Sequence, residues 1–368
     1  MRVEGGGEVN EQNLRRGVRI ALALFLVTLV SLLVPGCRIT GGGTTEDVPP
    51  PVTTSPEAQD TRPVGRPGII NIETEQELRG TRTAGTGVVL TASGLVLTNN
   101  HVIRGATGIR GTDADSRRSY TAEVVGYDRA GDIAVIRLRG ASRLRPAVFA
   151  SASGVNVGDP VTAIGNAGGD GGRPRVVTGE VTALDQSVTA RDDSSGTTER
   201  LTGLIETDAP IGPGDSGGPL LNAAGRVIGI NTAASAGLSP GSSGREDHRG
   251  YAIPSDRALE IARQIQRGES SLNVHIGPTA MLGVTVRSNP GSRGAVVAEV
   301  VPDSPAAAAG IPTGASIVAV DGRGVDSPDD LTTLMLEHHP GDVVQVQWTT
   351  AQGAHMSAAV RLAEGPPQ

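Results

Sequence analysis

The sequence predicts an all-β fold, a barrel or a sandwich, for most of the chain. Between residues 85 and 254, short apolar runs alternate with turn residues, as at 87–90, 95–98 and 133–136. The 368 residues include 52 glycines and 24 prolines, which favours many turns and short strands. Only three Tyr, two Phe and one Trp are present, so the core must consist mainly of Val, Ile, Leu and Ala.

Length, charge and cysteine content exclude several classes of protein. At roughly 150 residues per domain, the chain is long enough for two domains. It carries 32 basic and 39 acidic residues, a net charge of −7, which argues against a nucleic-acid-binding protein. The single cysteine, Cys37, excludes a disulfide framework and a thiolate zinc cluster. The sequence shows no ligand cluster for a metal or a nucleotide, so we expect no cofactor.

The N-terminal residues predict export from the cytoplasm. Arg15, Arg16 and Arg19 precede an apolar run at 20–34, the charged-then-apolar order of a signal peptide. As a helix this run spans roughly 22 Å, short of a ~30 Å hydrocarbon core. The run leads into Leu-Val-Pro-Gly-Cys, which resembles a bacterial lipobox and makes Cys37 a lipidation candidate. A lipoprotein signal, an uncleaved single-span anchor and a cleaved signal all remain open, and each places the rest of the chain outside the cytoplasm.

The remaining sequence divides into two strand-rich units. A disordered tether rich in Gly, Thr and Pro follows the export segment, and a helix and linker separate the two β units. We expect Ser255 to cap a helix over 256–267, and Ser327 and Pro328 to introduce a second helix over 329–338. The predicted boundaries are 1–37 for the export or anchor segment, 38–68 for the tether, 69–255 for the first β unit, 256–279 for the helix and linker, 280–363 for the second β unit and 364–368 for a tail.

A glycine-rich turn at 207–220 predicts a serine nucleophile. It reads Thr-Asp-Ala-Pro-Ile-Gly-Pro-Gly-Asp-Ser-Gly-Gly-Pro-Leu, with Ser216 at its centre. The glycines let a substrate backbone approach closely. The amides of Gly214 and Ser216 can point to one spot and bind an oxyanion.

A serine hydroxyl is a weak nucleophile until a base takes its proton. His101 lies at the end of a predicted strand, in Thr-Asn-Asn-His-Val, and histidine titrates near neutral pH. Asp132, at the start of an apolar strand, can supply the carboxylate that orients such a base. Taken alone, Asp132 would more often be a turn residue.

These segments, in the order His, Asp, Ser, resemble the chymotrypsin clan and most closely the HtrA/Deg family of trypsin-like proteases. The resemblance extends over 85–254. It implies a double β-barrel with the catalytic triad in the cleft between the barrels. His101 would be the base, Asp132 the group that orients it, and Ser216 the nucleophile.

The same resemblance implies a pocket for a substrate side chain. Pro210 would lie at the base of the specificity pocket and Ile211 and Ile230 would line it. Such a pocket favours substrates with a small or β-branched aliphatic side chain before the scissile bond.

Two features depart from the family. Asp215 stands where the family usually has Asn, and it is expected to be solvated or paired with an Arg. Relatives that trimerise often use aromatic residues before the first barrel. Residues 38–84 contain none, so a homotrimer is left open.

The second β unit resembles a PDZ domain of the bacterial protease type. Such a domain binds an extended peptide as an added strand and captures its terminal carboxylate with backbone amides. By resemblance, the amides around Leu282, Gly283 and Val284 would bind the carboxylate. Leu331 and Leu334 would line the side-chain pocket.

We therefore expect a serine endopeptidase of the cell envelope, tethered to the membrane, that degrades or processes misfolded exported proteins. Its PDZ domain would bind substrate C-termini or unfolded segments. One alternative is a signalling protease that cuts a specific membrane partner. Another is a chaperone or peptide-binding scaffold with a vestigial protease site.

Overall fold

The computed structural model describes residues 67–77, 80–166, 168–169, 171–191, 198–232, 249–288 and 293–368. All of them belong to one compact unit, 59–368. The predicted export segment, Cys37 and nearly all of the predicted tether lie outside the described residues. Within the described ranges, no helix has both the length and the apolar character needed to cross a membrane.

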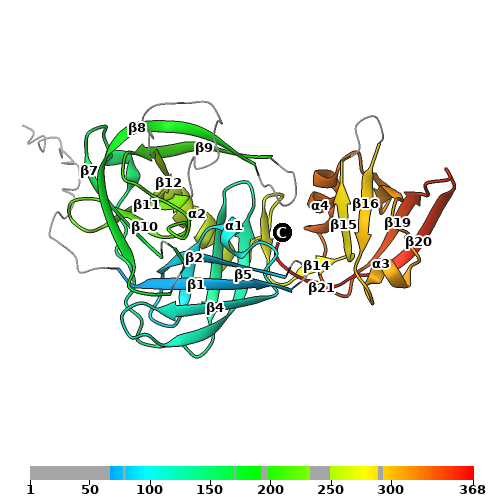
Figure 1. Ribbon diagram of the computed structural model, residues 1–368, viewed down its shortest axis with the longest axis horizontal. Coiled ribbons are helices and arrows are strands. Elements are labelled where there is room, and N and C mark those ends of the chain that lie inside the picture. The colour runs from blue at the N-terminus through cyan, green and yellow to red at the C-terminus, as the bar shows by residue number, and fades with distance from the viewer. Residues whose placement is uncertain are drawn as a thin grey trace, which may run out of the picture. The chain divides into compact units, whose positions relative to one another are not determined.

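The first six strands form a barrel (Figure 1). Their order is β5-β4-β1-β2-β3-β6, and a direct pairing of β5 with β6 closes it. Fully buried aliphatic side chains such as Ile70, Ile72 and Ile136 fill the interior. A one-turn helix, α1 (Asn100–Ile103), follows β3. The strands are β1 (Ile69–Gln76), β2 (Thr81–Val89), β3 (Leu95–Thr98), β4 (Gly108–Asp113), β5 (Ser119–Asp128) and β6 (Ile133–Leu138).

The next six strands form a second closed barrel, in the order β10-β11-β12-β9-β8-β7. A single buried cluster joins the two barrels and includes Leu97 and Ile133 from the first and Leu204 and Ile253 from the second. The predicted double β-barrel is therefore confirmed. The strands are β7 (Pro160–Gly165), β8 (Arg175–Arg191), β9 (Thr198–Thr207), β10 (Pro219–Leu221), β11 (Val227–Thr232) and β12 (Gly250–Pro254); a 3-10 turn, η2 (Ala152–Gly154), precedes them.

Helix α2 (Ser255–Gln266) lies where a helix is predicted, but its cap is different. The N-cap residue is Pro254, and the Ser255 hydroxyl instead donates a hydrogen bond to the carbonyl of Ala150 at 2.6 Å. The prediction that Ser255 caps the helix is therefore wrong, because a distant acceptor binds its side chain. Ile261 and Ile265 are buried as expected from an amphipathic helix.

The segment predicted as a plain linker, which ends at 279, contains one strand and the first residue of another. β13 (Val274–Ile276) extends the first barrel's sheet antiparallel to β5, with His275 opposite Tyr127. β14 (Thr279–Met281) pairs with β21 (Ala363–Gly365), which runs from the last residue of the predicted second β unit into the predicted tail. Three residues are too few to give a strand pattern in the sequence, and the partners of both strands are distant in the chain.

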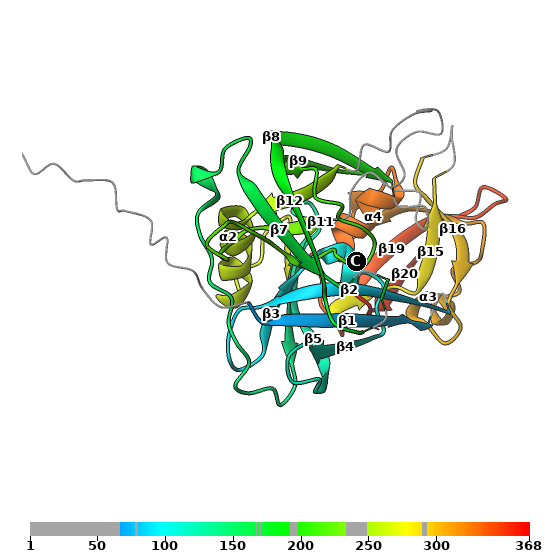
Figure 2. The same cartoon turned by 60° about the vertical axis from the view of Figure 1, so that its left-hand side comes forward.

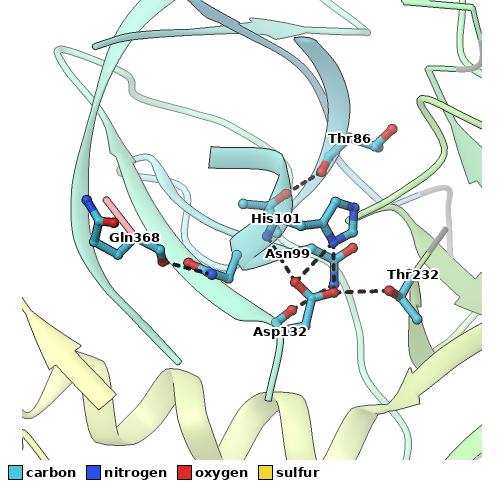
Figure 3. A network of polar contacts seen from close by, with 8 residues as sticks. Thr86, Asn99, His101, Asp132, Thr232 and Gln368 are labelled. Atoms are coloured by element: carbon cyan, nitrogen blue, oxygen red, sulfur yellow. Dashed lines mark hydrogen bonds and ion pairs between the residues drawn. The ribbon is translucent and has the colours of Figure 1, made fainter. Parts of the chain in front are cut away.

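The last residues contact the first barrel. Pro367 accepts a hydrogen bond from the Gly105 amide at 2.7 Å. The carbonyl of Gln368 accepts one from the side chain of Asn100 at 3.1 Å, beside α1 (Figure 3). The amide of Gln368 donates to the Tyr127 hydroxyl at 3.2 Å. The predicted tail is thus an ordered contact segment.

The C-terminal domain has its own sheet, in the order β15-β16-β17-β19-β20, and its own core, which includes Trp348. The predicted second helix is α4, capped by Ser327, whose hydroxyl accepts from the Asp330 amide at 3.1 Å. It ends at Met335, three residues earlier than predicted. The elements are β15 (Val284–Arg287), β16 (Ala295–Val300), α3 (Pro305–Ala308), β17 (Ser316–Val320), β18 (Arg323–Gly324), α4 (Pro328–Met335), β19 (Val343–Thr349) and β20 (His355–Arg361).

The first barrel's core predicts a graded loss of stability. Ile136 has no exposed surface, so Ile136→Ala should lower the free energy of unfolding by about 2–5 kcal/mol and Ile136→Val by about 0.5–1.5 kcal/mol. Urea unfolding followed by circular dichroism measures both. Val157, 62% exposed, supplies the control, and Val157→Ala should change stability by less than about 0.5 kcal/mol. Equal effects at the two positions would contradict this description of the core.

Candidate active site

His101 and Asp132 form the centre of the site (Figure 3). The Nδ1 atom of His101 lies 3.0 and 2.9 Å from the two carboxylate oxygens of Asp132. The backbone amide of His101 donates to Asp132 Oδ1 at 3.0 Å, and the Thr232 hydroxyl donates to Oδ2, also at 3.0 Å. The side-chain amide of Asn99 donates to the Asp132 carbonyl at 2.8 Å. Main-chain and side-chain contacts thus fix both residues.

This arrangement determines the chemistry of the imidazole. A carboxylate only accepts hydrogen bonds, so Nδ1 of His101 must carry the proton that faces Asp132. Nε2 is then the basic nitrogen. The His101 side chain is 30% exposed, whereas that of Asp132 is 2% exposed. The base therefore faces solvent while the group that orients it is buried.

A tight turn places Asp132 directly before β6. Its φ of 51° lies in the left-handed region, where Asp is tolerated better than most residues. The carboxylate of Asp128 fixes the turn by accepting a hydrogen bond from the Gly131 amide at 2.8 Å. Burial raises the pKa of Asp128, and hydrogen bonds from the Gly131 and Ala130 amides partly oppose this rise. A buried polar turn therefore positions the Asp132 carboxylate.

The turn that carries Ser216 is attached to the first barrel. The amide of Thr86 donates to the Ser216 carbonyl at 2.8 Å, and the Thr86 hydroxyl donates to the Gly214 carbonyl at 2.7 Å. Asn166 also donates its amide to the Gly214 carbonyl, at 3.2 Å. Within the described part of the chain, the amides of Gly214 and Ser216 donate to no acceptor. Both predicted oxyanion donors are therefore available to a ligand.

Glycine is required directly after Ser216. Gly217 has a φ of +82°, and a Cβ atom there would overlap the Thr86 carbonyl and the Thr98 hydroxyl. Its amide donates to the Asn231 carbonyl at 2.8 Å. The close approach of β2 and β3 to the turn explains the Ser-Gly-Gly sequence.

Asp215 is buried beneath the turn, not solvated. Its side chain is 2% exposed, and Arg175 Nη1 lies 3.8 Å from Oδ2. The Gly212 amide donates to Oδ2 at 3.0 Å. Burial raises the pKa of Asp215, while the Gly212 hydrogen bond and the Arg175 charge partly oppose this rise. Of the two expectations for Asp215, pairing with an Arg is the one the structure supports.

The three predicted pocket residues differ in accessibility. Pro210 and Ile211 are half-buried, whereas Ile230 has no exposed surface and packs in the core between the barrels. Residues 233–248 lie outside the described residues. The pocket therefore stays a prediction, with Pro210 and Ile211 as its accessible members.

The predicted peptide site of the C-terminal domain is built around the start of β15. The carbonyls of Leu282 and Gly283 accept hydrogen bonds from the amides of Ala306 at 2.9 Å and Val301 at 3.0 Å. The amides of Leu282 and Gly283 donate to no described residue. Val284 begins an edge strand with one unpaired side. These features are compatible with a peptide added as a strand.

The predicted pocket residues of that site are largely hidden. Leu331 and Leu334 lie on the buried face of α4, in the same cluster as Leu282. They are 4% and 6% exposed. Their role in peptide binding stays a prediction.

The sequence reasoning missed Thr232 and Asn99. Asn99 lies in the Thr-Asn-Asn-His-Val segment and Thr232 lies in the range 85–254 of the family resemblance, but no local pattern indicated that their side chains bind Asp132. Thr232 is 100 positions away from Asp132 in the chain. Across the described ranges, no group of three His, Cys, Asp or Glu side chains could hold a metal ion.

Comparison with known protein families identifies two domains in this chain. Residues 85–230 match the family model of the trypsin-like peptidase domain, and residues 280–353 match that of the PDZ domain. The serine protease PepD of Mycobacterium tuberculosis is 35% identical over 311 residues, which are 80% of this chain and 64% of PepD. The periplasmic pH-dependent serine endoprotease DegQ of Escherichia coli is 35% identical over 274 residues, 71% of this chain and 55% of DegQ.

The chain thus spans roughly half to two thirds of the length of these relatives. Among solved structures, the HtrA-type protease AlgW with a tripeptide is similar, with a TM-score of 0.46 and 29% identity over 83% of this chain and 96% of that one. The matched domains, their order and the similarity to PepD and DegQ show that the chain belongs to the HtrA/Deg family of trypsin-like serine proteases with a PDZ domain.

Proposed function

We propose that this chain is a serine endopeptidase that cleaves polypeptides with Ser216, His101 and Asp132. The observation that carries the proposal is the pair of contacts, 3.0 and 2.9 Å long, between His101 Nδ1 and the buried Asp132 carboxylate. The adjacent turn supports it, because it offers a serine and two amides without acceptors among the described residues.

The proposed chemistry uses these groups in turn. The Ser216 hydroxyl attacks the carbonyl carbon of the scissile bond while His101 Nε2 takes its proton. Negative charge forms on the carbonyl oxygen, where the amides of Gly214 and Ser216 stabilise it. The imidazolium then gives its proton to the leaving amine, and Asp132 stabilises the imidazolium without itself becoming protonated. Water hydrolyses the acyl-enzyme by the same steps.

We also propose an extracytoplasmic location and misfolded exported proteins as substrates. DegQ is named a periplasmic enzyme, and the charged-then-apolar N-terminal sequence favours export. The free amides of Leu282 and Gly283 and the unpaired edge of β15 support binding of an extended peptide. A tether through the membrane or through a lipid on Cys37 belongs to the same proposal.

Removal of the nucleophile tests the function directly. Ser216→Ala should reduce casein cleavage by about 10⁶-fold, as for loss of the nucleophile in a comparable serine protease. It should also abolish covalent labelling by a fluorophosphonate. Ser270, an exposed serine, supplies the control, and Ser270→Ala should retain both activities. Near wild-type cleavage by a folded Ser216→Ala protein would refute the assignment.

The hydrogen bond from Thr232 to Asp132 predicts a smaller loss of activity than removal of the nucleophile. Thr232→Val removes the hydroxyl that donates to Asp132 but leaves both contacts to His101. A hydrogen bond to a charged group contributes about 1.5–3 kcal/mol, so kcat should fall about 10- to 100-fold with little change in KM. Thr232→Ser keeps the hydroxyl and should restore the rate. A Ser variant as slow as the Val variant would show that packing, not the hydrogen bond, is responsible.

Asp215 predicts a pH dependence of stability. Because its pKa is raised in the folded protein, the folded state favours the protonated carboxyl. The stability that this group contributes is present in full below its unfolded pKa of about 3.9. It is lost as pH rises through the folded pKa. Asn does not titrate, so the stability of Asp215→Asn relative to wild type should increase from pH 4 to pH 7.

Urea unfolding of both proteins at several pH values measures this difference. Asn can still accept the Gly212 hydrogen bond, so the variant should cleave casein within a few-fold of the wild-type rate. A stability difference that stays constant or shrinks with rising pH would contradict the prediction. Asp208→Asn, at an exposed carboxylate in the same segment, is the control.

A further inference from the structure

A cavity of about 760 Å³ opens beside the turn that carries Ser216, residues 212–217, which we call the nucleophile turn. The loop residues that line it are Gly168, Gly169, Pro213 and Gly214, and residues of β2, β1, β4 and β5 form its floor. The predicted pocket residues Pro210, Ile211 and Ile230 do not line it. The cavity therefore starts at an oxyanion donor but is distinct from the predicted pocket for the side chain before the scissile bond.

The catalytic geometry indicates which part of a substrate enters this cavity. The amide of Gly214 fixes the position of the scissile carbonyl oxygen. If the side chain before that carbonyl lies toward Pro210 and Ile211, the chain after the scissile bond must leave on the opposite side. That side is formed by β2, where Ala84 lines the cavity and Thr86 is bonded to the nucleophile turn. The cavity is thus placed to receive the residues that follow the scissile bond.

The floor carries charges in a fixed order. β2, β1, β4 and β5 lie side by side in the sheet (Figure 2). Ala84, Glu73, Arg110 and Thr121 are direct cross-strand neighbours in that order. Three strand spacings span about 14 Å, which an extended peptide covers with about four residues. A substrate leaving the nucleophile therefore meets a carboxylate first and a guanidinium next.

The two charges are available to a ligand. Glu73 and Arg110 are exposed, and neither forms an ion pair or a side-chain hydrogen bond with another residue in the described ranges. The neighbouring row differs, because Arg82 Nη2 lies 3.0 Å from Glu75 Oε1 and the two charges compensate each other. Only the row that begins at Ala84 presents charges without partners among the described residues.

We propose that Glu73 and Arg110 select substrates by the order of charges after the scissile bond. A basic side chain nearer the bond pairs with Glu73, and an acidic side chain farther along pairs with Arg110. The reversed order places like charges together. The proposal rests on the catalytic roles proposed for Ser216 and Gly214.

Matched peptides test this with the full-length protein. The peptides share all residues before the scissile bond and differ only in the order of one Lys and one Asp after it. Alternate residues of an extended chain face the same side, so the two charged residues are placed two positions apart. Counted from the scissile bond, they stand at the second and fourth positions in one set of peptides and at the first and third positions in the other. In the set whose charged residues face the floor, the kcat/KM of the Lys-first peptide should be about two- to fivefold higher than that of the Asp-first peptide. This is the size of effect expected from an exposed ion pair.

Exchanging the two charges should invert the preference. The double variant E73R/R110E keeps the net charge and should favour the Asp-first peptide. The single variants Glu73→Gln and Arg110→Gln should each weaken the wild-type preference, which keeps the test valid if the double variant does not fold. As the matched control, E75Q/R82Q should leave the preference unchanged.

Three results would count against the proposal. Equal cleavage of both orders in both sets by the wild type would overturn it, and so would an unchanged preference in the folded double variant. Wild-type protein that cleaves neither these peptides nor an uncharged peptide would overturn the proposed protease function itself. Activity on the uncharged peptide thus distinguishes failure of this selectivity from failure of the function.

Discussion

The buried carboxylate of Asp132 is the group on which the site depends. It accepts hydrogen bonds from His101 on the first barrel and from Thr232 on the second. A buried charge without partners costs several kcal/mol, so these donors have to converge on it for the fold to be stable. The requirement that stabilises the carboxylate therefore also sets the orientation of the imidazole and the alignment of the two barrels at this point.

Strand β2 provides the second link between the barrels. Thr86 uses its amide for the Ser216 carbonyl and its hydroxyl for the Gly214 carbonyl, so the nucleophile turn of the second barrel is held by the first. These two carbonyls are thereby occupied, while the amides of the same two residues donate to no described acceptor. The same strand continues into the floor of the cavity. The contacts to the Ser216 turn and the floor of the cavity thus share one strand.

Much of this could be predicted from the sequence, and the exceptions have a common cause. The strand runs, α2, α4 and the motifs around His101, Asp132 and Ser216 are local patterns, and the two barrels follow the family resemblance that these motifs carry. Thr232, β13 and β21 act through partners far away in the chain, for which local patterns give no signal. Ser255 has the right type and place for a cap, but the Ala150 carbonyl binds its hydroxyl instead. Local propensity fails where a tertiary contact competes for the same group.

Contacts of the C-terminal residues help to position helix α1, which carries His101. Helix α1 is a single turn, and a helix of that length is not stable by itself. Its position therefore depends on its neighbours, among them Gln368, which binds the Asn100 side chain, and Pro367, which binds the Gly105 amide. Tyr127, which binds the Gln368 amide, precedes the turn that presents Asp132. The residues after the C-terminal domain thus contact α1, which carries His101, and β5, which precedes the turn of Asp132.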